Sequence, residues 1–159
     1  MIHGFLKACT VSPALRVADC AFNTQQTIAA MQRAAADGVQ LAVFPELGLT
    51  GYTCGDLFFQ QPLQRAAARG LAAVLEASAG LDLVALVGLP VTVDGKLYNC
   101  AAVVCHGKLL GLVPKTYLPN YGEFYERRQF NPAPAGVRTL HFAGQEVPVS
   151  YTHLRAHET

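Results

Sequence analysis

Apolar and polar positions change their period along this chain, and the changes divide it into predicted strands and helices. Apolar runs at residues 5–11, 41–44 and 83–89 predict three strands, and the last two are apolar enough to be buried in a sheet. Residues 24–37 and 62–79 carry apolar side chains near helical spacing, which predicts two helices. Asn23 is the expected N-cap of the first helix, and Gly38 and Gly80 are the expected stop signals.

Strand patterns dominate the rest of the chain. Residues 97–105 alternate in polarity between the turn dipeptides Asp94-Gly95 and His106-Gly107, which predicts hairpins. Residues 108–113 predict one more strand, whereas residues 116–134 have three prolines and no clear period and predict a long ordered loop or short helix. Strand, helix, strand and helix followed by hairpins indicate an α/β layered fold with a mixed sheet.

Composition and charge narrow the class of protein. A length of 159 residues favours a single domain, and 52% hydrophobic residues are enough for a substantial core. The formal net charge is only +1, and the charged residues are scattered along the chain. Nothing therefore indicates a nucleic acid or an anionic membrane as partner. The longest apolar run, residues 83–93, is too short to span a bilayer, and no secretory signal is evident. We therefore expect a cytoplasmic protein.

The cysteines and histidines predict neither a disulfide framework nor a metal site. Five cysteines without a C-x-x-C pair fit reduced thiols, and period two sends Cys100 and Cys105 to opposite faces of a strand. His153 and His157 have the one suggestive histidine spacing, but it is weak support for a metal. We expect no metal and no cofactor for this domain.

Two ionisable residues directly follow predicted strands. Glu46 comes after the strand at 41–44, and Lys115 after the strand at 108–113. Ligands of α/β sheets gather beyond the carboxyl ends of strands, where a glutamate base and a lysine that stabilises an oxyanion would suit acyl transfer from an amide. Taken singly, each residue more often has a structural role. A lone glutamate is commonly a helix cap or a solvated loop residue, and a lone lysine commonly faces solvent at the end of a strand.

The neighbouring sequence favours a site over those alternatives. Glycines that allow a ligand to approach and several aromatic residues accompany the two charges, although aromatic residues also pack beneath long loops. These residues are Gly48, Gly51, Gly55, Tyr52, Tyr117, Tyr121, Phe124 and Tyr125. Glu123 and Glu126 could each pair with a cation of the same loop, and Arg127-Arg128 is better explained as a structural ion pair or domain contact than as a substrate clamp.

The two motifs together resemble the nitrilase superfamily of carbon-nitrogen hydrolases. The resemblance rests on Phe-Pro-Glu-Leu-x-Leu-Thr-Gly-Tyr at 44–52, on Leu-Tyr-Asn at 97–99 and on the segment 114–130 that begins Pro-Lys-Thr-Tyr-Leu-Pro. It covers roughly residues 5–149 and is strongest to the N-terminal glutaminase domain of glutamine-dependent NAD synthetases. It implies a four-layer αββα sandwich, incomplete at the C-terminal side of this chain.

The resemblance also implies a Glu-Lys-Cys triad that hydrolyses glutamine through a thioester. Matched by position, Glu46 is the general base, Lys115 stabilises the oxyanion and Glu123 helps to position the substrate and the lysine. Tyr52 and Tyr121 match aromatic residues near the glutamine pocket, and Phe124 is a weaker match.

The chain departs from the family pattern at the nucleophile. The family's cysteine follows a further strand some tens of residues after the lysine motif, and none of the five cysteines here matches it. Cys54 lies nearest to the base motif but in a loop where the family has varied small residues. Residues 146–149 still resemble a family strand, whereas the polar residues 150–159 resemble translated adapter sequence. We therefore expect a partial hydrolase domain at 1–149, a non-family tail at 150–159 and a fragment that is inactive.

The expected partners follow from the same resemblance. The small-molecule substrate would be glutamine, and a synthetase domain of the same polypeptide would use ATP and magnesium and receive the ammonia. A homo-oligomer is expected for the full-length protein, and exposed sheet edges with one uncovered face are expected for this chain. Two alternatives stay open: a free-standing amidase or nitrilase, and a non-catalytic interaction module with the same fold.

Overall fold

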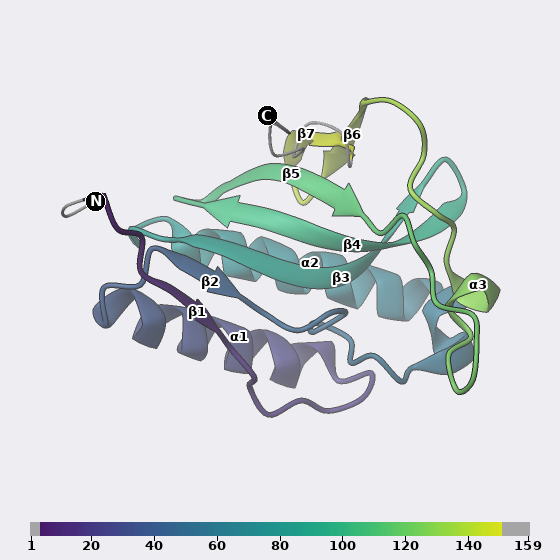
Figure 1. Cartoon of the computed structure of the whole chain (residues 1–159), viewed down its shortest axis with the longest axis horizontal. Coiled ribbons are helices and arrows are strands. Elements are labelled where there is room, and N and C mark those ends of the chain that lie inside the picture. Colours follow the sequence, from purple (N-terminus) through teal and green to yellow (C-terminus); the bar gives the residue numbers. More distant parts are fainter. Residues whose placement is uncertain (1–3, 151–159) are drawn as a thin grey trace.

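A mixed sheet of seven strands runs through the molecule in the order β1-β2-β3-β4-β5-β7-β6 (Figure 1). The computed structural model describes residues 4–150. Strands β1 to β3 are mutually parallel, β3, β4 and β5 form antiparallel hairpins, and β7 is parallel to β5 and antiparallel to β6. The elements are β1 Ala8–Thr10, α1 Cys20–Ala36, β2 Leu41–Val43, η1 Gly55–Phe59, α2 Gln61–Ser78, β3 Val84–Val93, β4 Lys96–Cys105, β5 Lys108–Pro114, α3 Glu126–Gln129, β6 Arg138–Phe142 and β7 Gln145–Val149.

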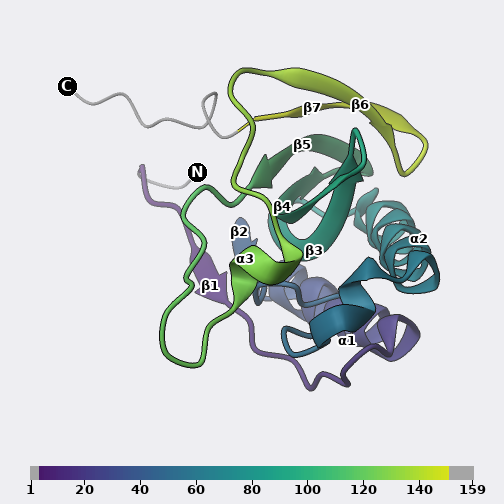
Figure 2. The ribbon, with the colours of Figure 1, turned by 90° about the vertical axis from the view of Figure 1, so that its right-hand side faces the viewer.

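Helices α1 and α2 pack side by side against one face of this sheet (Figures 1 and 2). The apolar stripe of α2 includes Leu71 and Val74, both fully buried, and Met31 of α1 joins them in the core. On the strands, every second residue turns to the helices, so Ala85 and Val87 of β3 are buried in that core. The predicted α/β class with a mixed sheet is confirmed.

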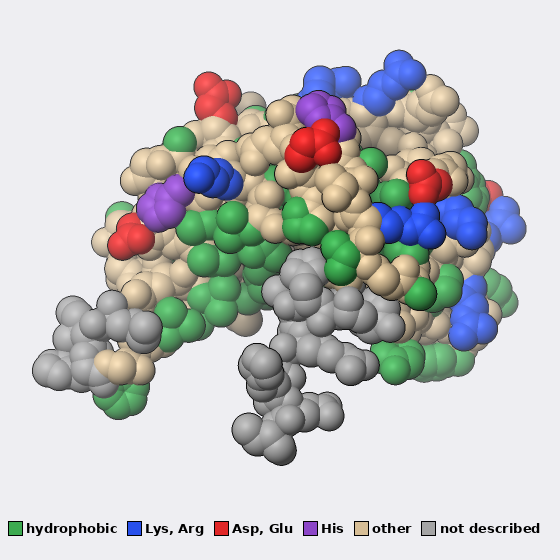
Figure 3. Space-filling view, turned by 90° about the horizontal axis from the view of Figure 1, so that it is seen from above, with side chains coloured by type: hydrophobic (Ala, Val, Ile, Leu, Met, Phe, Trp, Pro, Cys, Tyr) green, Lys and Arg blue, Asp and Glu red, His purple; other side chains and the backbone are tan. Residues whose placement is uncertain are grey.

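The other face of the sheet is only partly covered. Alternate residues of the central strands are half-buried there, although their neighbours on the helical side are buried. Figure 3 shows hydrophobic side chains gathered on the surface of the molecule seen from above. Of the four layers that the resemblance implies, residues 4–150 supply one helical layer and one sheet. The half-buried residues are Leu41, Val43, Val84, Leu86, Ala101 and Val103.

Both hairpins formed by β3, β4 and β5 turn at the predicted dipeptides. Asp94 and Gly95 have φ of 49° and 74°, and His106 and Gly107 have φ of 48° and 76°. Two consecutive residues at positive φ are typical of the two-residue turn whose twist matches antiparallel strands. A third hairpin, between β6 and β7, was not predicted, although Ala143 and Gly144 at its turn also have positive φ.

The start of α1 corrects one prediction. The helix begins at Cys20, and Asp19 is its N-cap, with the carboxylate accepting a hydrogen bond from the Phe22 amide at 3.0 Å. Asn23 is instead fully buried inside the helix, where its side chain bonds to the backbone of Arg16 and to the carbonyl oxygen of Leu49. An asparagine that is satisfied by distant backbone groups does not need to end a helix.

The predicted boundary between the hydrolase domain and the tail, at residues 149 and 150, is crossed by a hydrogen bond to the sheet. Ser150, the first residue of the expected tail, is buried, and its amide donates to the Leu112 carbonyl oxygen at 3.1 Å. The rest of that tail, with His153 and His157, lies outside the described residues.

Candidate active site

The backbone after β2 fixes the position of Glu46. The loop turns sharply, with the Gly48 amide donating to the Pro45 carbonyl oxygen at 3.0 Å and Leu47 at a φ of 51°. The Leu49 amide then bonds to the Gly88 carbonyl oxygen of β3 at 3.1 Å. These contacts hold the glutamate at the carboxyl end of β2, where the sequence predicted it.

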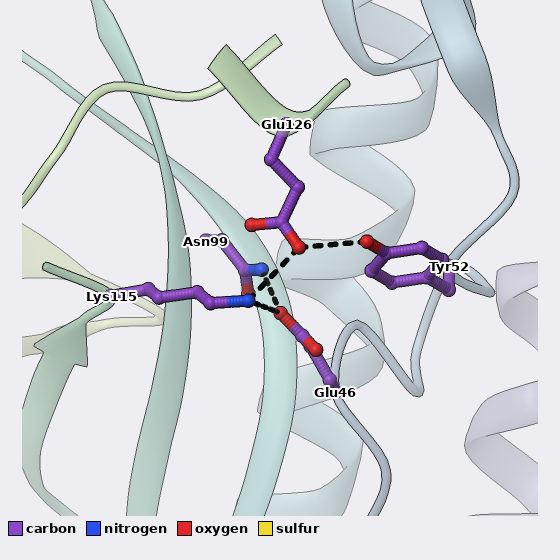
Figure 4. Close-up of polar contacts among 5 residues, drawn as sticks. All are labelled: Glu46, Tyr52, Asn99, Lys115 and Glu126. Carbon is purple, nitrogen blue, oxygen red and sulfur yellow. Dashed lines mark hydrogen bonds and ion pairs between the residues drawn. The ribbon is translucent and has the colours of Figure 1, made fainter. Parts of the chain in front are cut away.

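Lys115 reaches the same place from the end of β5. Its amide donates to the Asn99 carbonyl oxygen of β4 at 2.8 Å, which carries the pairing of β4 and β5 one residue beyond the strand. Its Nζ lies 2.7 Å from Glu46 Oε1 and 2.9 Å from Glu126 Oε1 (Figure 4). One ammonium group therefore bridges two carboxylates. The predicted meeting of Glu46 and Lys115 is present in the structure.

The second carboxylate is Glu126, not Glu123. Glu123 is exposed in the loop before α3, and the ion pairs that Lys115 makes within residues 4–150 run to Glu46 and Glu126. The expected positioning of Lys115 by Glu123 is thus corrected. Glu126 is the first residue of α3, which turns its side chain inward so that only 4% of it is exposed, against 42% for Glu46. The sequence marked Glu126 only as one of two carboxylates that could pair with a nearby cation.

Two uncharged donors complete the cluster. The Tyr52 hydroxyl donates to Glu126 Oε1 at 2.7 Å, and the Asn99 side-chain amide donates to Glu46 Oε1 at 2.5 Å (Figure 4). The Tyr52 hydroxyl is thereby directed to a carboxylate. Asn99 has no advance signal in the sequence beyond its place in the Leu-Tyr-Asn motif, and the strand pairing brings it to the site.

The charges of the cluster keep the lysine protonated. Desolvation lowers the pKa of Lys115, but hydrogen bonds and charge attraction from Glu46 and Glu126 outweigh it, so the pKa is raised above its ordinary value. Desolvation, followed by the hydrogen bond to Glu126 and the charges of both carboxylates, also raises the pKa of Tyr52. At neutral pH the cluster holds an ammonium and a neutral phenol, both of which donate hydrogen bonds.

A cavity of about 360 Å³ opens at these residues. Its wall combines the polar groups of Glu46, Asn99 and Lys115 with apolar side chains that include Phe44, directly after β2, and Leu86 of β3. A larger hollow of about 740 Å³ lies at the loop that precedes and follows α3 and shares no lining residue with the first. Because the charged groups are in the smaller cavity, we identify that one as the candidate active site.

The predicted substrate-binding residues lie in two different settings. Tyr52 is half-buried against Glu126, as described above. Tyr121 is 72% exposed and lines the larger hollow, with its ring 5.9 Å from that of Phe124 in an edge-to-face arrangement. None of these three aromatic residues lines the smaller cavity. Their predicted contact with the substrate stays a prediction.

Cys54, in the loop after Glu46, and Cys100, in the cavity wall, do not provide an activated thiol at this site. Cys54 is buried, its Sγ donates to the carbonyl oxygens of Thr50 and Gly51, and desolvation raises its pKa. Cys100 borders the cavity but is 2% exposed, and burial raises its pKa as well. Thiols of raised pKa are poor nucleophiles. Cys105 lies six residues from Asn99 along β4, about 20 Å at the rise of a strand.

The arginine pair and the acidic, histidine and cysteine side chains add no second site within residues 4–150. Arg128 forms a bidentate pair with Asp56 of η1 at 2.9 and 2.7 Å, which agrees with the predicted structural ion pair for this arginine. Within residues 4–150, no group of three or more His, Cys, Asp or Glu side chains is placed to hold a metal ion. The helices in that range are all too short or too polar to cross a membrane.

Comparison with known proteins identifies the family. The family model described as carbon-nitrogen hydrolase matches residues 7–154. The glutamine-dependent NAD(+) synthetase of Mycobacterium tuberculosis is 38% identical over 145 residues, which cover 91% of this chain and 21% of that protein. The chain thus spans about a fifth of the length of this curated relative.

Solved structures extend the comparison to the fold. A glutamine-dependent NAD(+) synthetase from Cytophaga hutchinsonii superimposes with a TM-score of 0.85 and 26% identity over 91% of this chain and 25% of that one. The amidase from Nesterenkonia sp. AN1 superimposes with a TM-score of 0.67 and 22% identity over 91% of this chain and 56% of that one. The amidase, at this identity, supports the fold alone.

Proposed function

The chain belongs to the carbon-nitrogen hydrolase family, and from this premise we propose that it supplies the Glu46 and Lys115 part of the glutamine-hydrolysing site of a glutamine-dependent NAD synthetase. The observation that carries the proposal is the single ammonium of Lys115 between the carboxylates of Glu46 and Glu126. Relatives that bear this name match over 91% of the chain, which supports glutamine as the substrate.

The proposed reaction assigns a task to each charged group. A cysteine thiol gives its proton to Glu46, and the thiolate attacks the side-chain carboxamide carbon of glutamine. The negative charge that develops on the carboxamide oxygen faces the ammonium of Lys115. The C–N bond breaks as Glu46 returns the proton to the leaving nitrogen, so ammonia departs and a thioester remains. Water then hydrolyses the thioester to glutamate and restores the thiol.

The nucleophile is assigned to a cysteine of a longer polypeptide, because none of the five cysteines of this chain matches the family's position. The buried thiols of Cys54 and Cys100 have raised pKa values and do not suit the role. On this proposal the 159-residue chain alone does not hydrolyse glutamine. The ammonia would pass to a synthetase region of a longer polypeptide, where ATP and magnesium would be used.

Ammonia release from glutamine tests the proposal in the longest open reading frame that contains this chain. We expect Glu46→Gln and Lys115→Met to lower kcat by about 10²–10⁴-fold, the range of general acid–base and oxyanion contributions. Glu76→Gln and Lys108→Met are matched controls, since both side chains are exposed and lie away from the cavity. Full activity in either site variant would remove the role assigned to that residue.

An amidase acting on another small amide is the second candidate, because the matching family model is that of carbon-nitrogen hydrolases in general and does not specify one amide. The same preparations separate the two proposals when they are offered acetamide and glutamine in parallel. Faster turnover of acetamide, with an open reading frame that has no ATP-using region, would favour the amidase.

A further inference from the structure

Asn99 contacts both proposed catalytic residues from a fixed position in β4. The residue pairs with Pro90 of β3 in the sheet and is 4% exposed. Its carbonyl oxygen accepts the Lys115 amide, and its side-chain Nδ2 donates to Glu46 Oε1. One residue in the middle of the sheet therefore holds the backbone of the lysine and the carboxylate of the glutamate.

The hydrogen bonds around Glu46 are one-sided. Asn99 Nδ2 and Lys115 Nζ both approach Oε1, and no hydrogen bond among the described residues reaches Oε2 (Figure 4). A carboxylate has two oxygens and can accept up to about four hydrogen bonds. Two donors on one oxygen fix the rotation of the group and leave the other oxygen to accept a proton.

A neutral amide suits this position better than a second cation or an apolar side chain. It orients the carboxylate without adding positive charge, and added positive charge would lower the tendency of Glu46 to take a proton. An apolar residue of the same size would leave Lys115 as the one donor to Oε1 among the described residues, so the rotation of the glutamate, which is 42% exposed, would be less restricted.

We propose that Asn99 is a positioning residue for the base: its side-chain amide binds Glu46 Oε1 and so reserves Oε2 for the proton of the nucleophile. The inference rests on the proposed function for its consequence in catalysis. The contact between Asn99 and Glu46 can be tested without catalysis, so the positioning proposal and the proposed function can fail separately.

The contact is tested by a double-mutant cycle in the 159-residue chain. The stability to urea is measured for the wild type, Asn99→Leu, Glu46→Ala and the double variant. Residues in contact give non-additive effects, and distant ones give additive effects. We expect Asn99→Leu to shift the urea midpoint by clearly different amounts in the wild type and in Glu46→Ala. A parallel cycle with Glu76→Ala, at an exposed glutamate, should be additive. Additivity with Glu46→Ala would overturn the proposal, whether or not the protein hydrolyses glutamine.

The catalytic consequence is tested in the longer polypeptide with Asn99→Leu and Asn99→Asp. We expect Asn99→Leu to lower kcat about tenfold to a hundredfold, the worth of one hydrogen bond to a charged group, with KM changed less than about twofold. The acidic limb of the pH profile of kcat/KM should move to higher pH, because the carboxylate loses a donor that stabilises its charged form.

Asn99→Asp separates positioning from packing. Aspartate has nearly the size and shape of asparagine but places a negative charge beside Glu46, so we expect it to be slower than Asn99→Leu and to move the acidic limb further. A purely structural role predicts the reverse order, with the isosteric aspartate better tolerated and the limb unmoved. Asn131→Leu is the matched control, since its amide bonds the Leu97 carbonyl oxygen of the same strand without contact to Glu46. An unmoved limb in both Asn99 variants would refute the positioning role.

Discussion

The position of Glu46 depends on a residue that carries no functional group. Gly88 lies in β3 directly beneath the loop that contains Glu46, and a Cβ there would lie 2.5 Å from the Pro45 carbonyl oxygen and would also clash with the Leu47 amide. Both neighbours are backbone atoms, which cannot rotate away as a side chain could. The close approach of the loop to the sheet therefore requires glycine.

Gly88→Ala tests this packing at the scale of one methyl group. We expect the free energy of unfolding to fall by about 1–3 kcal/mol, the usual cost of overpacking, and the loop with Glu46 to move away from β3. Urea unfolding gives the first quantity, and a crystal structure of the variant gives the second. Gly80→Ala is the control, because no atom lies within 4 Å of a Cβ at that position. Equal stability of the two variants would contradict the close-packing argument.

The raised pKa of Tyr52 makes the free energy of unfolding fall at alkaline pH. Its pKa is raised by desolvation and then by the hydrogen bond and charge of Glu126, whereas an unfolded tyrosine ionises near pH 10. A raised folded pKa means that the unfolded chain binds fewer protons above pH 10. Its stabilising contribution is complete below that pH and is lost as the pH rises through the folded value. Lys115, whose pKa is also raised, acts in the same direction.

We therefore expect the free energy of unfolding to fall above about pH 10 and to fall less steeply in Tyr52→Phe. Urea unfolding at a series of pH values measures the slope. Absorbance of tyrosinate in the folded protein provides a second measure, since Tyr52→Phe should remove one late-ionising group. Identical slopes for the wild type and Tyr52→Phe would show that the phenol does not ionise differently on folding.

At the scale of elements, the short helix α3 places Glu126, and two kinds of contact attach it to η1. Phe130, directly after α3, is 4% exposed, and its ring lies 4.9 Å from that of Phe58. Arg128 and Asp56 form a bidentate pair, but both side chains are 60% exposed. Exposed ion pairs contribute little, because water and salt screen them. The aromatic contact should therefore hold the helix.

Phe130→Ala and Asp56→Asn compare these contacts directly. We expect Phe130→Ala to cost about 3–5 kcal/mol in the free energy of unfolding, as is typical for a buried phenylalanine. Asp56→Asn should change stability very little. Calorimetry or urea unfolding ranks the two variants. A larger loss from Asp56→Asn would mean that the ion pair, and not the rings, anchors α3.

At the scale of the whole molecule, the sheet is covered by helices on one face and is apolar on the other. Val103 of β4 lies half-buried on that second face, together with Leu86 of β3. Apolar patches of this kind favour association between molecules. The expectation of an uncovered face therefore agrees with the structure, and its consequence in solution is open to measurement.

We expect the 159-residue chain to self-associate with rising concentration and Val103→Lys to reduce that association, because a charge on the face opposes its burial. Light scattering coupled to gel filtration measures the molar mass. Val137→Lys is the control, since Val137 is already 59% exposed outside the strands. A wild-type chain that remains a monomer at all concentrations would refute the prediction.

The sequence by itself determined most of the local structure. The order of the strands and the two long helices as far as β5, the two turns at Asp94-Gly95 and His106-Gly107, and the placement of Glu46 and Lys115 at strand ends follow from short-range patterns, whereas η1 and the β6-β7 hairpin were not predicted. Period, turn chemistry and β-strand propensity act over a few neighbouring residues, so a single sequence displays them. The family motifs at 44–52 and 114–130 added the expected chemistry.

Only the tertiary structure decided which polar groups meet. Asn99 and Glu46 are 53 residues apart in the chain, and Tyr52 and Glu126 are 74 apart. The residue pattern alone left Glu123 and Glu126 open and the family resemblance pointed to Glu123, but the start of α3 turns Glu126 inward and leaves Glu123 exposed. Asn23 likewise bonds to Leu49, 26 residues away, instead of capping its helix. Such contacts depend on strand register and helix docking, which no short-range pattern specifies, so folding settles them.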